Sequence, residues 1–145
     1  MKSITFFVPG LPKAQPRPRA YARHGIVRVY NPGTTDAWKK DIGHAWELAG
    51  GQQFIGPVMC TLAFKMPRPK SHICAMGVKE SAPDWCVTKP DCDNLAKAVL
   101  DKLSLCGAWI DDSWVTILKV KKTYANETFL VGCEIYITEL EEKSC

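Results

Sequence analysis

Prolines divide this chain into segments that can form helices and segments that cannot. Three prolines lie between residues 12 and 18, and four more are Pro67, Pro69, Pro83 and Pro90. Because proline lacks an amide hydrogen and clashes with the preceding helical turn, both regions are expected to be extended or irregular. The helices of the fold must therefore come from the segments between and after these regions.

Two such segments have the spacing of amphipathic helices. Residues 36–49 place a core-facing stripe at helical spacing, and the segment is bounded by Thr34 or Thr35 as a cap and by Gly50-Gly51 as a stop. Residues 93–104 carry a second apolar face, with Asp93 as the expected N-cap and Gly107 after the end. The stripes consist of Trp38, Ile42, Ala45, Trp46 and Ala49, and of Leu95, Ala96, Val99, Leu100 and Leu103.

Apolar runs predict the strands, which fall at residues 4–8, 57–66, 113–124 and 129–138, with a short one at 85–87. The runs at 113–124 and 129–138 are expected to pair as antiparallel neighbours. Residues 13–30 are expected to form an extended basic loop, and 139–145 a polar tail. The pattern predicts one α/β (α+β) domain over residues 1–145, with a mixed β-sheet and two main helices in two layers, in the order β-α-β-(β)-α-β-β.

The net charge of +4 hides two halves of opposite sign. Residues 1–90 carry 13 Lys and Arg against 5 Asp and Glu, whereas residues 91–145 carry 6 against 10. This division suggests a polyanionic partner and a separate acidic cluster, although the charges alone fit a mixed surface equally well. Tyr21, His24 and Tyr30 lie among the first basic residues and favour nucleic acid, because aromatic rings stack on bases.

The chain has no sequence signal for secretion or for a membrane span. No apolar run approaches the roughly 18 residues of a transmembrane helix, and the opening run 4–8 has neither the basic flank nor the cleavage site of a signal peptide. We therefore expect a cytoplasmic protein with reduced thiols. Structural zinc is disfavoured, because the spacings of His72, Cys74, Cys86 and Cys92 are irregular and no paired CxxC motif occurs.

The chemistry is expected between residues 89 and 112. If the backbone is extended through Asp91, then Asp91 and Asp93 point the same way, and Lys97 follows one helical turn later. Carboxylates on a helix amino end suit Mg²⁺ or Mn²⁺, and only one of Asp111 and Asp112 can join them. Aspartates are also common as caps and in turns. An acidic cluster framed by basic loops repels DNA unless a divalent ion neutralises it, which points to metal-dependent phosphodiester hydrolysis.

These residues resemble the RusA family of Holliday junction resolvases, many of which are carried by prophages. The resemblance rests on KPDCDNLAKAVLDKLSLCGAWIDDSWV at residues 89–115, and more weakly on the PGxPxxQPRPR loop, residues 64–70 and the final strands. It implies a small homodimeric endonuclease, dependent on Mg²⁺ or Mn²⁺, that cuts symmetric strands of four-way junction DNA in recombination and repair. No nucleotide cofactor and no membrane are implied, and the expected location is the bacterial or phage-infected cytosol.

The resemblance also assigns residues. It implies catalytic roles for Asp91, Asp93, Asp112 and Lys97, with the same three aspartates and the adjacent Asp111 as metal ligands. Contacts to the DNA backbone are expected from basic side chains, namely Lys13, Arg17, Arg19, Arg23, Arg68, Lys70 and Lys89. Two alternatives stay open, a broader nuclease for flaps and forks and a catalytically silent junction-binding protein. The 67–90 insertion is longer than in the most compact members.

Overall fold

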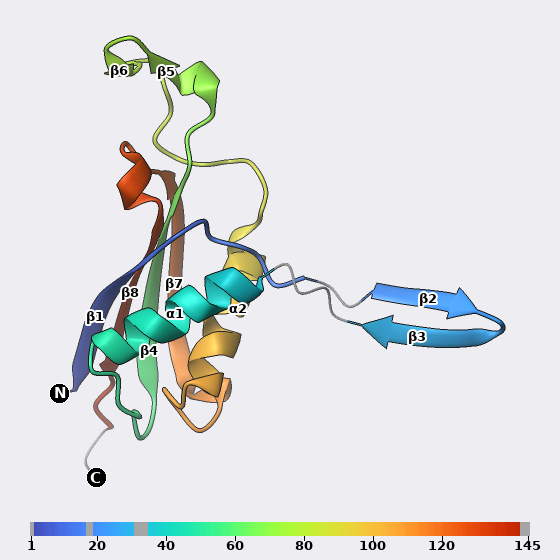
Figure 1. Cartoon of the computed structure of the whole chain (residues 1–145). Coiled ribbons are helices and arrows are strands. Elements are labelled where there is room, and N and C mark those ends of the chain that lie inside the picture. Colours follow the sequence, from blue (N-terminus) through green and yellow to red (C-terminus); the bar gives the residue numbers. More distant parts are fainter. Residues whose placement is uncertain (1, 17–18, 31–34, 143–145) are drawn as a thin grey trace.

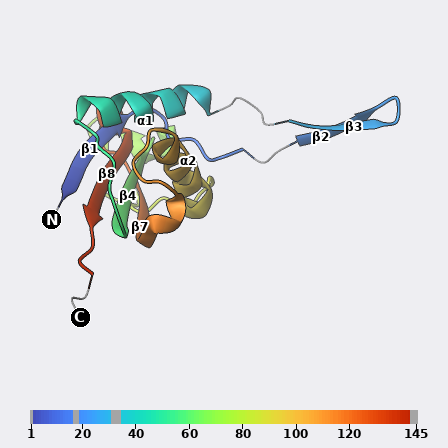
Figure 2. The same ribbon diagram turned by 90° about the horizontal axis from the view of Figure 1, so that it is seen from below.

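A mixed four-stranded sheet forms the body of the protein, with two helices packed on one of its faces (Figures 1 and 2). The structure, a computed structural model, describes residues 2–16, 19–30 and 35–142. The sheet order is β1-β8-β4-β7, from strands Ser3–Pro9, Gly132–Glu139, Val58–Met66 and Val115–Tyr124. This architecture confirms the predicted mixed sheet and its two main helices.

The helices lie close to their predicted positions. Helix α1 spans Asp36–Leu48 and contacts β1, and helix α2 spans Cys92–Leu105 and contacts β7. Gly107 adopts φ +80° after α2, and the amide of Ala108 donates to the carbonyl of Leu103, which completes a left-handed helix stop. Within the described part of the chain, no helix is long and apolar enough to cross a membrane.

The prediction that the last two long strands are neighbours was wrong. Strand β8 pairs antiparallel with both β1 and β4, whereas β7 pairs parallel with β4 on its other side. The register sets Leu62 opposite Val120 on β7 and opposite Ile135 on β8. Strand β4 therefore lies at the centre of the sheet, between the two strands that were expected to pair.

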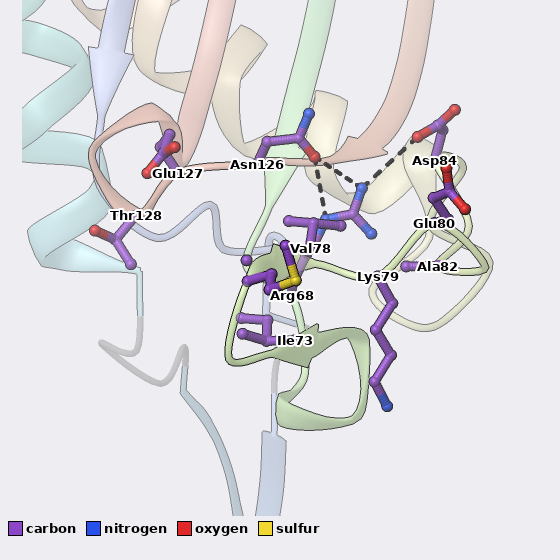
Figure 3. Close-up of a pocket in the computed structure, with 12 residues that line it drawn as sticks. Arg68, Ile73, Val78, Lys79, Glu80, Ala82, Asp84, Asn126, Glu127 and Thr128 are labelled. Carbon is purple, nitrogen blue, oxygen red and sulfur yellow. Dashed lines mark hydrogen bonds and ion pairs between the residues drawn. The ribbon is translucent and has the colours of Figure 1, made fainter.

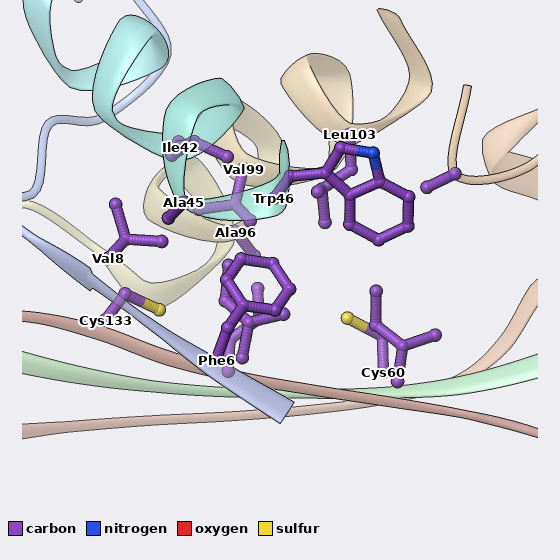
Figure 4. Close-up of a cluster of buried hydrophobic side chains, with 14 of the residues drawn as sticks. Phe6, Val8, Ile42, Ala45, Trp46, Cys60, Ala96, Val99, Leu103 and Cys133 are labelled. Atoms are coloured by element: carbon purple, nitrogen blue, oxygen red, sulfur yellow. The ribbon is translucent and has the colours of Figure 1, made fainter. Parts of the chain in front are cut away.

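The core fills the space between the helices and one face of the sheet (Figure 4). Strand alternation sends Phe6 and Val8 of β1, Cys60 of β4 and Cys133 of β8 to this face, where all four are buried. The helices cover them with buried side chains that Figure 4 labels, namely Ile42, Ala45, Trp46, Ala96, Val99 and Leu103. Burial raises the pKa of the Cys60 thiol to about 12, as expected for a cysteine that packs as a small hydrophobe.

The basic region after β1 contains a hairpin where an extended loop was expected. Strands β2 (Arg19–Arg23) and β3 (Ile26–Tyr30) pair antiparallel and extend away from the sheet (Figures 1 and 2). His24 and Gly25 form the turn, and both have positive φ, at 51° and 76°. Two central residues with positive φ are what a two-residue hairpin requires, so this His-Gly pair turns the chain back on itself.

The 67–90 insertion contains less regular structure than the sheet. It holds the 3₁₀ helix η1 (Lys70–His72) and the short strands β5 (Ile73–Cys74) and β6 (Gly77–Val78). The strand expected at residues 85–87 is reduced to a single bridge between Trp85 and Thr123. Two further 3₁₀ helices, η2 (Asp112–Trp114) and η3 (Thr128–Leu130), precede β7 and β8.

Candidate active site

A groove of about 560 Å³ lies between α2, η2 and β7, and it collects charged side chains over an apolar floor. Asp93, Lys97 and Asp101 line it from α2, and Asp112 lines it from η2. The floor consists of Ala96, Leu100, Leu118 and Val120. Three of the four residues with an expected catalytic role therefore share one groove, although they come from two separate segments of the chain.

The helix spacing explains why three charged residues of α2 face the groove together. Asp93, Lys97 and Asp101 recur every four residues, so they form one stripe along the helix. The opposite side of the helix packs in the core, with Leu95, Val99 and Leu103 fully buried. Burial of that apolar face fixes the rotation of α2 and thereby directs the charged stripe outward.

The N-cap of α2 is Asp91 and not Asp93, which corrects the prediction. Asp91 has extended dihedral angles, φ −75° and ψ 153°, and its carbonyl accepts from the amide of Leu95. Pro90 restricts its own backbone and that of the residue before it but not the residues after it, so the helix can begin immediately after Asp91. Asp93 lies in the first turn, where the positive end of the helix dipole stabilises its negative charge. Asp91 is exposed and does not line the groove.

The pair Asp111-Asp112 divides its two carboxylates between different environments. The Ser113 hydroxyl donates to Oδ2 of Asp111 at 2.7 Å, and this hydrogen bond lowers the pKa of Asp111. Asp112 begins η2 and lines the groove, whereas Asp111 does not. Of the two residues, Asp112 is therefore the one that shares the groove with Asp93.

The donor set of the groove suits a hard divalent cation. Carboxylate oxygens are the ligands that Mg²⁺ and Mn²⁺ prefer, and Mg²⁺ keeps several waters while using only one or two protein carboxylates with substrate phosphate. Among residues 2–16, 19–30 and 35–142, no three acidic, histidine or cysteine side chains form a preassembled metal cluster. Asp93 and Asp112 therefore fit a site that a metal completes with water and a phosphate oxygen.

Asp101 is a groove residue that sequence reasoning missed. It is half-buried, and it lies one helical turn beyond Lys97 on the same stripe. The signal was present in the spacing, because a residue four positions after a lysine on an exposed helix face is its neighbour. Asp101 therefore adds a third carboxylate to the groove walls.

The basic residues expected to contact DNA lie on several segments around the body. Lys13, Arg23, Lys70 and Lys89 are exposed, on the loop after β1, on the hairpin, on η1 and just before α2. Arg19 is the first residue of β2, and Arg17 lies outside the described residues. The amide of Gln15 donates to the carbonyl of Asn94 at 3.1 Å, so the loop that carries Lys13 reaches the first turn of α2.

The side chain of Arg68 is enclosed by neighbouring segments and does not lie on the surface, where it was expected. Its side chain is only 3% exposed, and its guanidinium donates to Oδ1 of Asn126 at 2.9 and 3.2 Å (Figure 3). It also donates to the carbonyl of Pro83 at 2.7 Å. It also lies 5.2 Å from the ring centre of Tyr124 and 3.7 Å from Asp84. Its donors therefore fasten the insertion to the β7–β8 turn, and this enclosed position does not fit the DNA contact expected of Arg68.

Arg68 also lines a second cavity, of about 610 Å³, between the insertion and the β7–β8 turn (Figure 3). Acidic and basic side chains line this cavity together with exposed Ile73 and Met76. None of the residues with an expected catalytic role lines it. The groove along α2, although slightly smaller, is therefore the better candidate for the chemistry.

Replacing Arg68 with alanine is expected to lower the free energy of unfolding by about 1–3 kcal/mol, because the substitution removes an almost fully buried side chain and its charge-assisted hydrogen bonds to Pro83 and Asn126. Lys70→Ala, in the same basic segment but exposed, is expected to change it by less than about 0.5 kcal/mol. Urea denaturation measures both values. If Arg68→Ala left the stability unchanged but weakened DNA binding, Arg68 would instead be a DNA-contact residue.

Comparison with known proteins identifies the class of protein to which this fold and groove belong. The chain matches the family model described as Endodeoxyribonuclease RusA over residues 9–138. It is also 36% identical over 131 residues to a Bacillus subtilis (strain 168) protein described as uncharacterized protein YqaN, with 88% of this chain and 92% of that protein covered. The class is thus that of an enzyme that cuts DNA internally. The chain belongs to the RusA endodeoxyribonuclease family.

Proposed function

We propose that this protein is a Mg²⁺- or Mn²⁺-dependent endonuclease that resolves Holliday junctions by paired nicking. The observation that carries the proposal is the gathering of Asp93, Lys97 and Asp112 around one groove. The carboxylates of this groove repel DNA phosphates unless a cation lies between the carboxylates and the phosphate. The acidic residues would therefore bind the cation, and the basic residues elsewhere on the chain would bind the DNA. Recombination and repair in the bacterial or phage-infected cytosol is the setting that fits this activity.

The side chains have separate roles in the proposed reaction. Asp93 and Asp112 would hold the metal, and Asp91 would join them at the helix start when DNA is bound; Asp111, engaged with Ser113, is the weaker ligand candidate. A divalent ion in this position supplies an activated water and stabilises charge on the scissile phosphate. The ammonium of Lys97 would balance negative charge on the same phosphate. Asp101, one turn beyond, would orient Lys97.

The exposed basic residues would hold the DNA arms without reading their sequence. Lys89 adjoins the acidic cluster, Lys70 lies on the insertion, and Lys13 and Arg23 lie on the segments after β1. Contacts of this kind fix the orientation of the duplex through its phosphates. A homodimer completes the proposal, because two symmetric nicks in a two-fold symmetric junction require two sites related by the same symmetry.

The deciding experiment compares cleavage of a synthetic four-way junction, a fork, a flap and a linear duplex, each with Mg²⁺, with Mn²⁺ and with EDTA. We expect paired symmetric nicks in the junction, little cutting of the linear duplex and none in EDTA. Equal cutting of flaps, forks and junctions would instead indicate a broader branched-DNA nuclease. Tight junction binding without cutting in either metal would indicate a catalytically silent binding protein.

A further inference from the structure

Lys122 is a charged residue on the helix-facing side of the sheet. It shares this side of β7 with Val120 and Tyr124, which are partly buried against the core, whereas Lys119 and Lys121 on the other side of the strand are exposed. Its ammonium donates to the carbonyl of Thr88, and to the carbonyl of Pro90 at 2.6 Å. Within the described part of the chain, no carboxylate lies within 4.0 Å of this ammonium. Its hydrogen-bond partners are thus backbone carbonyls, and both precede the acidic start of α2.

The backbone beside these carbonyls is also fastened to β7. The amide of Cys86 donates to the carbonyl of Lys122 at 3.1 Å, and the amide of Tyr124 donates to the carbonyl of Asp84 at 2.9 Å. These bonds lie on either side of the bridge between Trp85 and Thr123. Residues 84–86 are therefore held by the edge of β7, and the lysine side chain continues this hold to residues 88 and 90.

The position of Pro90 gives this contact a consequence for the site. Its carbonyl belongs to the peptide group that joins Pro90 to Asp91, the N-cap of α2, and Asp93 follows in the first turn. A charged donor to this carbonyl fixes the orientation of that peptide group. A loop held at residues 86, 88 and 90 leaves little freedom to the backbone that presents Asp91.

We propose that Lys122 is a positioning residue for the metal-binding end of α2. It acts by holding the carbonyls of Thr88 and Pro90, so that Asp91 and Asp93 are presented with a fixed backbone when metal and DNA bind. The inference rests on the proposed function, since it assigns these aspartates to a metal. Replacing a side chain that orients metal ligands typically lowers metal affinity or activity by about 10–100-fold.

The test compares Lys122→Met with Lys121→Met, which removes a charge from the neighbouring exposed position. We expect Lys122→Met to weaken Mn²⁺ binding, measured by the electron paramagnetic resonance of free Mn²⁺, by about 10-fold or more. Junction cleavage should lose kcat by a similar factor, while junction affinity without metal stays within about twofold. Lys121→Met should match the wild type in all three measurements. Lys122→Arg, which keeps a charged donor, should recover most of the Mn²⁺ affinity.

Two further results distinguish a failure of the role of Lys122 from a failure of the proposed nuclease function. Equal Mn²⁺ affinity and kcat in Lys122→Met and Lys121→Met would overturn the role of Lys122, whatever the substrate. A wild-type protein that cuts no branched DNA would overturn the proposed function instead. If Lys122→Met melts below the assay temperature, Lys122→Arg and a Lys122→Gln variant, measured at a temperature where both are folded, decide the same question. An Mn²⁺ affinity in Lys122→Gln equal to wild type, without a charge at this position, would count against the inference.

Discussion

Asp93→Asn is expected to abolish cleavage of a four-way junction while leaving the junction bound. Asparagine has nearly the same shape as aspartate, but its neutral amide is a weak metal ligand. Loss of a charged ligand from the groove is expected to lower kcat by about 10³-fold, which corresponds to about 4 kcal/mol of transition-state stabilisation. Binding should persist or tighten, because one negative charge facing the phosphates is removed. Single-turnover cleavage and a mobility-shift titration measure the two effects.

The chain contains a matched control for this substitution. Asp36 lies in the first turn of α1, just as Asp93 lies in the first turn of α2, but it is exposed and does not line the groove. Asp36→Asn should therefore keep full cleavage activity and lose at most a few tenths of a kcal/mol of helix stabilisation. Full cutting by Asp93→Asn in Mg²⁺ would remove Asp93 from the metal site.

Trp109→Ala is expected to destabilise the protein more than any substitution in the groove. Trp109 is 1% exposed in the core, and its indole Nε1 donates to Oγ of Ser104 at 2.7 Å. Truncation of a buried tryptophan leaves a large cavity and removes this hydrogen bond. The expected loss is about 3–5 kcal/mol of unfolding free energy, which is a large part of the total stability of a small domain.

A second tryptophan provides the comparison. Trp85 is 63% exposed, so Trp85→Ala should change the unfolding free energy by less than about 1 kcal/mol. Trp109→Phe should fall between the two, because it keeps most of the apolar volume and loses the hydrogen bond. Equal denaturation midpoints for Trp109→Ala and the wild type would show that Trp109 is not part of the cooperative core.

The local patterns of the sequence predicted most of the elements, because the forces that set them are local. The predicted helix limits, 36–49 and 93–104, agree with the observed ones to within one residue at each end. They could be predicted because apolar periodicity and the glycines after each helix act over only a few positions. Strand order was harder to predict. The alternation of Cys133, Ile135 and Ile137 shows which face of β8 is buried, but it contains no information on which strands lie beside it.

The hairpin was missed for a different reason. The prolines before it excluded a helix, and the basic composition then favoured a loop, although His24-Gly25 lies between two runs of suitable length. A non-glycine residue with positive φ is uncommon, so His-Gly is a weaker turn signal than Asn-Gly or Asp-Gly.

In the candidate site, the sequence predicted residue types better than it predicted their surroundings. The four-residue spacing placed Asp93 and Lys97 on one helix face, and the groove contains both. Arg68 was misjudged because a positive charge does not reveal burial. Its acceptors, the carbonyl of Pro83 and Oδ1 of Asn126, come from segments 15 and 58 residues away. Only the folded arrangement of these segments shows that the guanidinium is enclosed.

The strand order also limits when this protein can fold during synthesis. Strand β8, the last strand of the sheet in sequence, lies between β1 and β4, which are made much earlier. Until residue 139 has left the ribosome, β1 lacks its partner and β4 has only β7 beside it. Until then the apolar faces of β1 and β4 are open to aggregation, and the sheet closes through contacts of large sequence separation.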